Sequence, residues 1–182
     1  MENEGRREAG KSDGGVSPMA PLLLLTACAG LVVWLNIVSS RPTGPAPPPV
    51  FRKTIYQEDE NGCGPAALAM VLTDHGIVAA PGEIAAGRLK GGDGMSMLEL
   101  KSYAESRGLA VAGWRLTYED LRSAPKPAIL LVSGGHFLVV DSIDGLGRAL
   151  CRDPQAGNKL YPREVMAAMW QGEALVFTAT QK

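Results

Sequence analysis

Cys63 is the residue whose type and setting most favour covalent chemistry. It stands between Gly62 and Gly64, at the start of a run with helical spacing. The unpaired N–H groups and the positive dipole end of a helix stabilise a thiolate and lower the pKa of a thiol. Glycine on either side leaves room for a carbonyl group to approach the sulfur. The alternative is a structural thiol in the core, the usual setting of a free cysteine, and we expect that role for Cys151.

A nucleophilic cysteine needs a general base, and the chain has two histidines. His75 lies in the same predicted helix as Cys63, about 18 Å along its axis, so it cannot accept the thiol proton. We expect His75 to be a residue of the helix C-terminus. His136 begins a predicted strand directly after two glycines, which favours it as the base. Its alternative role is that of a hydrogen-bonded residue in the core or at a sheet edge.

Asp153 is the carboxylate that we expect beside His136. Asp144-Gly145 is a strong signal for a two-residue hairpin turn, and counting outward from that turn places His136 opposite Asp153. Directly opposed residues have Cβ atoms about 4.5–5.5 Å apart, close enough for a carboxylate to orient an imidazole. Asp141 is predicted to point to the other face of the strand. A turn of another length would break the pairing and leave Asp153 as a strand-ending residue.

The elements that position these residues are predicted to be helices first and strands afterwards. Hydrophobic periodicity, capping residues and turn signals define them. The expected helices span residues 63–75, 81–86, 96–107 and 162–171, and the expected strands span residues 109–116, 128–132, 136–143, 146–152 and 174–180. Helices followed by a mainly antiparallel sheet give an α+β fold class.

The chain before this domain divides into three segments. Residues 1–18 are polar, charged and glycine-rich, which is typical of a disordered tail. Residues 19–40 carry no charge, and as a helix of about 33 Å they would span a hydrocarbon core of about 30 Å. Residues 41–53 are rich in proline and predict a stiff linker. We therefore expect residues 54–182 to be a domain tethered to a membrane by one transmembrane helix.

A cleaved signal peptide or a lipoprotein signal is the alternative for the apolar segment, because small residues precede Cys28. The apolar run continues for about ten residues beyond Cys28, which favours an uncleaved anchor with Cys28 inside the membrane helix. Basic residues are balanced on its two sides, so the positive-inside rule does not set its orientation. The short tail and the rigid linker favour a domain outside the cytoplasm.

Composition and motif context exclude several functions. Eighteen Lys and Arg against 19 Asp and Glu give a net charge of −1, without the basic excess of a nucleic-acid-binding protein. Three cysteines and two histidines are too few for a disulfide scaffold or most structural zinc sites, so we expect no metal and no cofactor. The stretch from Gly5 to Ser12 matches the phosphate-loop pattern, but it lacks the preceding buried strand that this motif needs. ATP binding is therefore not predicted.

The candidate residues belong to a longer pattern. In order along the chain it consists of Gln57-(x)5-Cys63-Gly64-x-Ala66, Gly94-(x)3-Leu98, Ala104-Glu105, Gly108-Leu109, His136-Phe137-x-Val139-Val140 and Asp153-Pro154. Over about residues 54–182, this order and spacing resembles that of the bacteriocin-processing cysteine peptidases. These form a papain-like family, found at the N-terminus of bacteriocin-exporting ABC transporters and also as separate bacterial proteins.

The resemblance implies a papain-like fold and a role for each candidate residue. It makes Cys63 the nucleophile of a thioester mechanism, His136 the general base and acid, and Asp153 the carboxylate that orients the imidazole. It makes Gln57 a side-chain donor to the oxyanion, beside the backbone N–H of Cys63. One such donor is worth about 2.7–4 kcal/mol at the transition state. Without the resemblance, Gln57 is a solvated residue before an acidic loop.

The resemblance also implies a substrate and partners. The family cuts peptide precursors after a Gly-Gly or Gly-Ala pair that ends a leader, which implies a narrow slot and an apolar groove for an amphipathic leader helix. Residues that would line this groove, unless they belong to the core as such residues more often do, are Met95, Met97, Leu98 and Tyr103. The sequence carries no transporter segment, so the expected partner is a separate ABC exporter in the bacterial cell membrane.

Two other functions fit the same fold. The domain would then be a catalytically idle module that binds leader peptides for an exporter, or a papain-like hydrolase of cell-wall peptides. The joint presence of Cys63, His136 and Asp153 argues against an idle module. Gln57 and the Ala/Gly-rich helix after Cys63 favour the leader peptidase over the cell-wall hydrolase.

Overall fold

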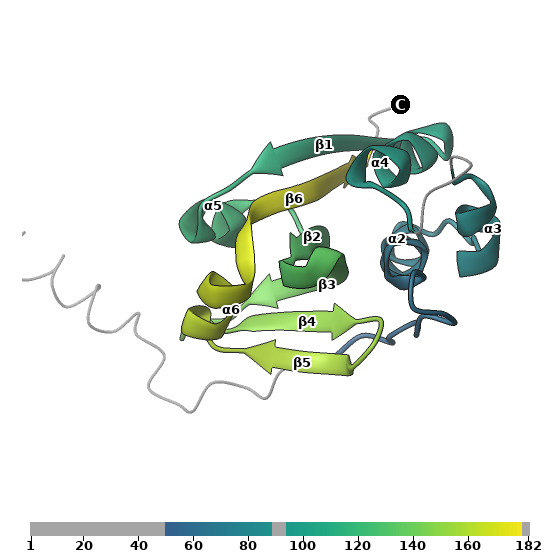
Figure 1. The fold of residues 1–182 in the computed structure, drawn as a ribbon. Coiled ribbons are helices and arrows are strands. Elements are labelled where there is room, and N and C mark those ends of the chain that lie inside the picture. Colours follow the sequence, from purple (N-terminus) through teal and green to yellow (C-terminus); the bar gives the residue numbers. More distant parts are fainter. Residues whose placement is uncertain (1–49, 89–93, 180–182) are drawn as a thin grey trace, which may run out of the picture. The chain divides into compact units, whose positions relative to one another are not determined.

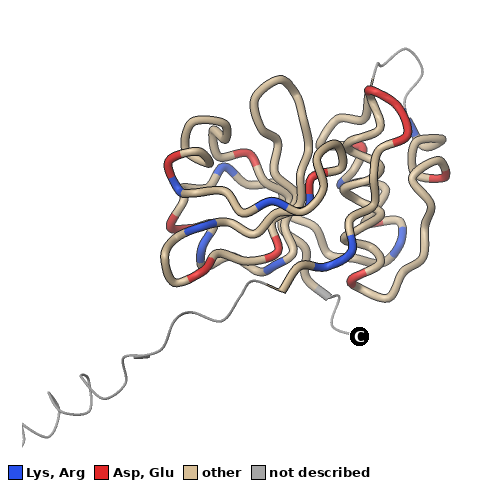
Figure 2. The backbone as a smooth tube through the Cα atoms, turned by 90° about the horizontal axis from the view of Figure 1, so that it is seen from below, with Lys and Arg blue, Asp and Glu red and all other residues tan. Residues whose placement is uncertain are grey.

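The computed structural model describes residues 50–88 and 94–179 (Figure 1). The predicted tail, the predicted membrane helix and all but the last residues of the predicted linker lie outside the described residues. Within the described residues, no helix has the length and apolar character needed to cross a membrane. Acidic and basic positions are interspersed over the described elements (Figure 2).

Helices come first in the domain, close to their predicted bounds: α2 (Cys63–Asp74), α3 (Pro81–Ala86) and α4 (Met97–Ser106). The predicted capping box starts α4: the Ser96 side chain accepts from the Glu99 N–H, and the Glu99 carboxylate accepts from the Ser96 N–H. After α2, Gly76 takes the left-handed conformation with φ 76° that stops a helix. Local capping chemistry therefore sets where these helices begin and end.

A six-stranded sheet follows, in the order β1-β6-β2-β3-β4-β5, and every neighbouring pair is antiparallel. The strands are β1 (Leu109–Arg115), β2 (Ala128–Val132), β3 (His136–Ile143), β4 (Ala149–Asp153), β5 (Gly157–Tyr161) and β6 (Trp170–Ala179). Between them lie the helix α5 (Tyr118–Ser123), the 3-10 turn η1 (Ser133–Gly135) and the helix α6 (Arg163–Met169). The predicted α+β class with an antiparallel sheet is confirmed.

Both faces of the sheet are covered. Figure 1 shows α2, α3 and α4 on one side of the molecule and α5 and α6 on the other. Along β3, Phe137 and Val139 belong to the hydrophobic cluster with α2, whereas Leu138 and Val140 belong to a second cluster. Cys151 is fully buried in that second cluster, as expected. Successive side chains of β3 thus point into the two cores in turn, and α2 packs against this strand, which begins with His136.

The loop between β3 and β4 differs from the predicted two-residue turn. It is held by Asp144, whose N–H donates to the Arg148 carbonyl at 2.9 Å. The Asp144 carboxylate in turn accepts from the N–H groups of Leu146 and Arg148. Gly147 adopts φ 74°, which glycine allows without strain. A side chain that binds several loop N–H groups therefore stabilises a longer connection than Asp144-Gly145 alone predicts.

The longer loop makes the predicted register wrong. The observed pairs are Val139↔Arg152, Val140↔Cys151, Ser142↔Leu150 and Ile143↔Ala149, with a bulge between Val140 and Ser142. Continuing this register places Asp153 opposite Leu138 and diagonal to His136. Diagonal neighbours still lie within reach of a long side chain. The expected contact between Asp153 and His136 therefore survives the change in register.

The strand β5 was not predicted, and α6 is shorter than the predicted helix 162–171 because Trp170 already begins β6. Gly157, at φ 80°, turns the chain after β4 and starts β5. A Cβ atom at this position would lie 2.7 Å from the Tyr56 hydroxyl. Glycine is thus required here both for the turn and for the close approach of the segment that precedes α2.

Candidate active site

Cys63 is the first residue of α2, and its exposed fraction is 8%. No side chain accepts a capping hydrogen bond from the backbone N–H groups at this helix end. A Cβ at Gly64 would lie 3.3 Å from the Phe137 ring. Glycine at this position therefore lets the start of α2 approach β3 closely, which brings Cys63 toward the strand that carries His136.

His136 begins β3 after two glycines in left-handed conformations, Gly134 at φ 78° and Gly135 at φ 75°. These glycines turn the chain sharply from η1 into the strand. The Nε2 atom of His136 lies 2.9 Å from Oδ1 of Asp153, as the sequence predicts for this pair. The His136 side chain remains 21% exposed, whereas that of Asp153 is 8% exposed. The imidazole is therefore anchored on its buried side and open on the other.

The Asp153 carboxylate is held in place by its own turn. Its Oδ1 also accepts from the N–H groups of Gln155 at 2.8 Å and Ala156 at 3.2 Å. The Tyr161 hydroxyl lies 3.5 Å from Oδ2. An ionised carboxylate only accepts hydrogen bonds, so Nε2 of His136 carries a proton in this contact. The other ring nitrogen, Nδ1, is then the one available to a thiol.

Cys63 and His136 shift each other toward their charged forms. Burial alone raises the pKa of the Cys63 thiol, but hydrogen bonds from the His136 side chain and the Phe137 backbone, with the charge of His136, bring it below its ordinary value. The hydrogen bond with Cys63 raises the pKa of His136; burial opposes this, and the hydrogen bond and charge of Asp153 support it. The arrangement favours a thiolate beside an imidazolium. A thiolate is the nucleophilic form of cysteine.

Gln57 lies on the same side of the molecule as this pair and is tied to the loop before α2. Its Nε2 donates to the Asp59 carbonyl at 2.9 Å, and its backbone N–H donates to the Pro154 carbonyl at 2.9 Å. The side-chain Oε1 is buried without a partner. Because a side-chain amide has two N–H donors, one remains for a further acceptor. The segment 57–59 therefore fixes the amide beside the turn that follows Asp153.

A cavity of about 410 Å³ joins these residues. Gln57, Cys63 and His136 all line it, so the structure brings three of the four candidate residues to one wall, with Asp153 behind the imidazole. Glycines make up much of the remaining lining: Gly64, Gly94, Gly134 and Gly135. The rest of the lining consists of Glu60, Asn61, Met95, Phe137 and Gln155. At the glycines, the main chain of a peptide can lie against bare backbone.

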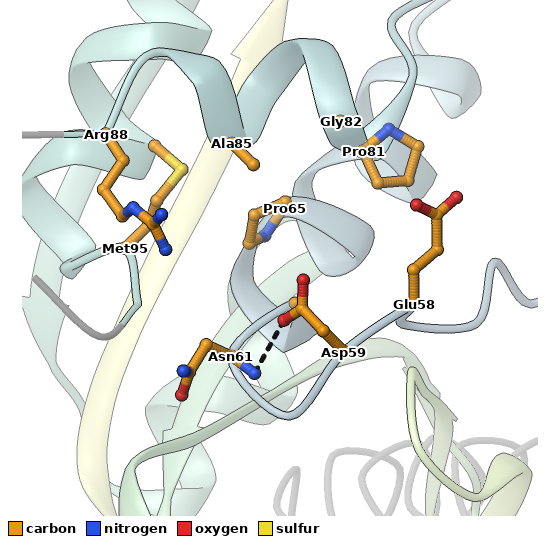
Figure 3. A pocket seen from close by; sticks show the side chains of 10 residues that line it. Glu58, Asp59, Asn61, Pro65, Pro81, Gly82, Ala85, Arg88 and Met95 are labelled. Atoms are coloured by element: carbon orange, nitrogen blue, oxygen red, sulfur yellow. Dashed lines mark hydrogen bonds between the residues drawn. The ribbon is translucent and has the colours of Figure 1, made fainter.

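A smaller pocket lies beside this cavity, between the loop before α2 and α3 (Figure 3). Its volume is about 50 Å³, much smaller than that of the cavity beside Cys63. Figure 3 shows Asp59, whose Oδ1 accepts from the Asn61 N–H at 2.9 Å, beside the ring of Pro65. Met95 lines both cavities. The pocket adds no group that acts on the sulfur or the imidazole.

Two of the four residues named for a leader groove, Met97 and Leu98, share one cavity. An open apolar cavity of about 340 Å³ lies between α4 and β1, lined by Met97 and Leu98 with Trp114. Trp114 was not named from the sequence, although the alternation of β1 places this residue on the exposed face of the strand. Tyr103 is not part of this groove, because its hydroxyl donates to Glu83 at 3.0 Å. Met95 instead lines the slot beside Cys63.

Comparison with known proteins gives close relatives. A probable functional amyloid protease of Pseudomonas aeruginosa, FapD, is 31% identical over 133 residues, which are 67% of this chain and 58% of that protein. A putative ABC transporter ATP-binding protein of Mycoplasma pneumoniae is 32% identical over 124 residues, 67% of this chain and 18% of the transporter protein. The chain thus spans less than two thirds of the length of either relative.

Solved structures and a family profile agree with these relatives. The double glycine motif protease of an AMS/PCAT transporter, solved with its leader peptide, has a TM-score of 0.65 and 29% identity, covering 76% of this chain and 96% of that chain. The peptidase domain of Streptococcus ComA shares the fold, with a TM-score of 0.65 at 22% identity, over 71% of this chain and 100% of that domain. The resemblance to bacteriocin-processing peptidases and the predicted enzyme class, a cysteine peptidase, are confirmed. Because the profile of the peptidase C39 family matches residues 52–182, the chain belongs to that family.

Proposed function

We propose that this protein is a membrane-tethered cysteine peptidase that cleaves peptide precursors after a double-glycine-type leader. The observation that carries the proposal is the contact of His136 with Asp153 beside a thiol of lowered pKa, on the wall of a glycine-lined cavity. A peptide-binding module has no use for a thiolate paired with an anchored imidazolium. Its recognition of a peptide would need the cavity alone.

The reaction begins with the Cys63 thiolate, which attacks the carbonyl carbon of the scissile peptide bond. The oxyanion that forms accepts hydrogen bonds from the Cys63 backbone N–H and from the free N–H of the Gln57 amide. His136, protonated on Nδ1, gives that proton to the leaving amine as the C–N bond breaks, and a thioester remains. Neutral His136 then takes a proton from water, which attacks the thioester and releases the thiolate. Asp153 orients the ring throughout.

Specificity for small residues follows from the walls of the slot. Gly134 and Gly135 have no side chains and hold left-handed conformations that other residues rarely adopt. Without side chains, these glycines let the backbone of a substrate approach the imidazole closely, and small residues of the substrate allow the same close approach from their side. Gly-Gly at the end of a leader satisfies this condition, whereas a β-branched pair does not. Small residues before the scissile bond are therefore favoured because they permit close backbone contact with this wall.

The leader itself is proposed to bind as a helix in the groove between α4 and β1. Leu98 is 71% exposed and Trp114 is 57% exposed, and both line this groove. Large exposed apolar side chains that share one concave surface favour an apolar helix face as their occupant. The solved relative bound to a leader peptide supports a leader as the occupant.

We further propose that residues 19–40 anchor the protein in the bacterial cell membrane, with the peptidase domain outside the cytoplasm. The linker would begin at residue 41, and its last residues, Arg52 and Lys53, already contact the domain. A separate ABC exporter would deliver the precursor, and the likeness to a transporter protein supports this partner. A reporter enzyme active only outside the cytoplasm, fused after Lys182, tests the orientation. Activity of that reporter is expected. Activity of a reporter that works only in the cytoplasm would reverse the assignment.

The function is tested by incubating the protein with a precursor peptide that ends its leader in Gly-Gly and measuring the products by mass spectrometry. A single cut after the second glycine is expected from the wild type and none from Cys63→Ala. A matched peptide with Val-Val in place of Gly-Gly is expected to remain intact. Binding without cleavage would favour the idle leader-binding module, and cleavage of cell-wall peptides alone would favour the other hydrolase.

A further inference from the structure

A second polar cluster lies at the other end of α2 from Cys63. We call it the charge cluster; its members are Arg52, Asp74, Asp141 and Arg152. Nη2 of Arg152 donates to Oδ2 of Asp74 at 2.5 Å and to Oδ1 of Asp141 at 2.7 Å. Nη1 of Arg52 lies 3.2 Å from the same Asp74 oxygen. The Arg152 side chain is 2% exposed, so this guanidinium is shielded from solvent and salt.

Each member of the charge cluster belongs to an element that also carries a candidate site residue. The pairs on one element are Asp74 with Cys63 on α2, Asp141 with His136 on β3, Arg152 with Asp153 on β4, and Arg52 with Gln57 on the segment before α2. The same four pieces of chain therefore meet twice, once at the sulfur and once at the guanidinium of Arg152.

Two local features aim these groups at each other. The bulge in β3 falls between Val140 and Ser142, which is where Asp141 turns its carboxylate to Arg152. Bulges next to active sites commonly redirect one side chain in this way. The Nε atom of Arg152 is buried without a partner. The Nη2 donors of Arg152 are thus directed at one carboxylate on α2 and one on β3.

We infer that Arg152 is a positioning residue for the reaction: by bridging Asp74 and Asp141 it fixes α2, β3 and β4 relative to one another, and so sets the sulfur–imidazole–carboxylate geometry. The inference rests on the proposed function for its consequence in catalysis, but the geometry itself is independent of any substrate. Guanidinium suits this role because it is permanently charged and planar, with its donors in fixed directions. A displacement of about 1 Å at a reacting group lowers a rate by about a hundredfold.

The test uses Arg152→Lys, which keeps the positive charge and loses the fixed fork of donors. The rate of Cys63 alkylation by iodoacetamide is measured against pH in the full chain, with the modified cysteine identified by mass spectrometry. We expect the midpoint of this profile to move up toward that of an ordinary thiol, because the hydrogen bond from His136 loosens. On the Gly-Gly peptide we expect kcat to fall about ten- to a hundredfold, with KM little changed.

Three further variants separate positioning from loss of stability. Arg148→Lys makes the same substitution at a partly exposed ion pair of the β3–β4 loop, and Met166→Ala weakens the second core on α6. Both are expected to keep the wild-type alkylation midpoint. Asp141→Asn, which preserves shape and removes the charge that Arg152 binds, is expected to shift the midpoint in the same direction as Arg152→Lys and replaces it if that variant does not fold.

The inference is overturned if Arg152→Lys keeps the wild-type midpoint and kcat, or if Met166→Ala shifts the midpoint as much as Arg152→Lys does. Failure of the proposed function has a different signature. In that case the wild type leaves the Gly-Gly peptide intact, while the alkylation profiles still report whether Arg152 sets the environment of the Cys63 sulfur.

Discussion

The two ends of α2 are built alike but behave differently. At its start, the Cys63 sulfur meets a base, His136, that is held by the buried acid Asp153. At its end, the carboxylate of Asp74 meets the guanidinium of Arg152, which also donates to a second carboxylate, that of Asp141 on β3. The start opens onto a cavity of about 410 Å³. The end borders a smaller pocket of about 240 Å³, and the Arg152 side chain there is 2% exposed. The start therefore presents its sulfur and imidazole to a cavity, whereas the end holds its guanidinium between carboxylates.

The two ends differ because an imidazole lies at the centre of one and a guanidinium at the centre of the other. An imidazole gains and loses a proton near neutral pH, so His136 can exchange one with a substrate. A guanidinium keeps its charge at every pH that the fold survives, so Arg152 can only hold its partners. Removing one partner from such a buried ion pair destabilises a protein by about 3–5 kcal/mol. The comparison therefore predicts that substitutions at the start of α2 abolish turnover. Substitutions at its end are expected to lower both the stability of the fold and the rate of turnover.

The largest expected effect comes from removing the sulfur. Cys63→Ala is expected to lower kcat on the Gly-Gly peptide by about 10⁴-fold or more, because loss of the nucleophile leaves only binding and the oxyanion donors. Initial rates measured by chromatography give the ratio. Cys151→Ala makes the same change at a fully buried thiol of the second core and is expected to retain most activity. Equal losses in both variants would mean that α2 does not carry the chemistry.

The next effect concerns the oxyanion. Gln57→Ala removes a side-chain donor and is expected to lower kcat by about a hundred- to a thousandfold, with KM little changed, since the interaction forms only in the transition state. Gln171→Ala, at an exposed position of β6, is the matched control and is expected to behave as wild type. A rise in KM at constant kcat would instead place Gln57 in substrate binding.

The pH dependence of the rate reports on Cys63 and His136. Below the lowered pKa of Cys63 the sulfur is protonated, and above the raised pKa of His136 the imidazolium has lost the proton that the leaving amine needs, so kcat/KM is bell-shaped. Asp153→Asn removes a charge that raises the pKa of His136. The alkaline limb is therefore expected to move to lower pH, so that the rate on that limb falls.

The control for this shift is Glu164→Gln, which removes an exposed charge on α6. It is expected to leave both limbs in place. An alkaline limb that does not move in Asp153→Asn would show that another group, not His136, delivers the proton.

The sequence predicted the start of α2 far better than its end. Cys63 between glycines, His136 after two glycines and Asp153 within a hairpin each leave a local signal. The charge cluster leaves none, because Asp74 and Arg152 are 78 residues apart and look like ordinary surface charges in the sequence. Pairing across elements becomes visible only once the fold is known. The charge cluster at the end of α2 was therefore missed entirely.

The fold was predicted where local chemistry decides it. Ser96 with Glu99 sets the start of α4, and Gly76 sets the end of α2. β5 was missed because residues 157–161 have neither alternation nor β-branched side chains, and their partner strand holds them extended. The register of the β3–β4 hairpin was wrong because Asp144 stabilises a longer loop and Asp141 lies at a bulge. The contact of His136 with Asp153 was still correct because side chains reach a diagonal neighbour.

The smallest expected effect lies away from both ends of α2, in the groove between α4 and β1. Leu98→Lys places a charge where an apolar leader face is proposed to bind and is expected to raise KM about tenfold, less than full burial of a leucine is worth. kcat should stay near wild type, because Leu98 touches neither the sulfur nor the imidazole. Leu146→Lys is the matched control, since Leu146 is 74% exposed against 71% for Leu98 but lies in the β3–β4 loop. An equal rise of KM in both variants would mean that added charge alone repels the peptide, and a fall of kcat in Leu98→Lys would mean that the groove and the site are coupled through α4.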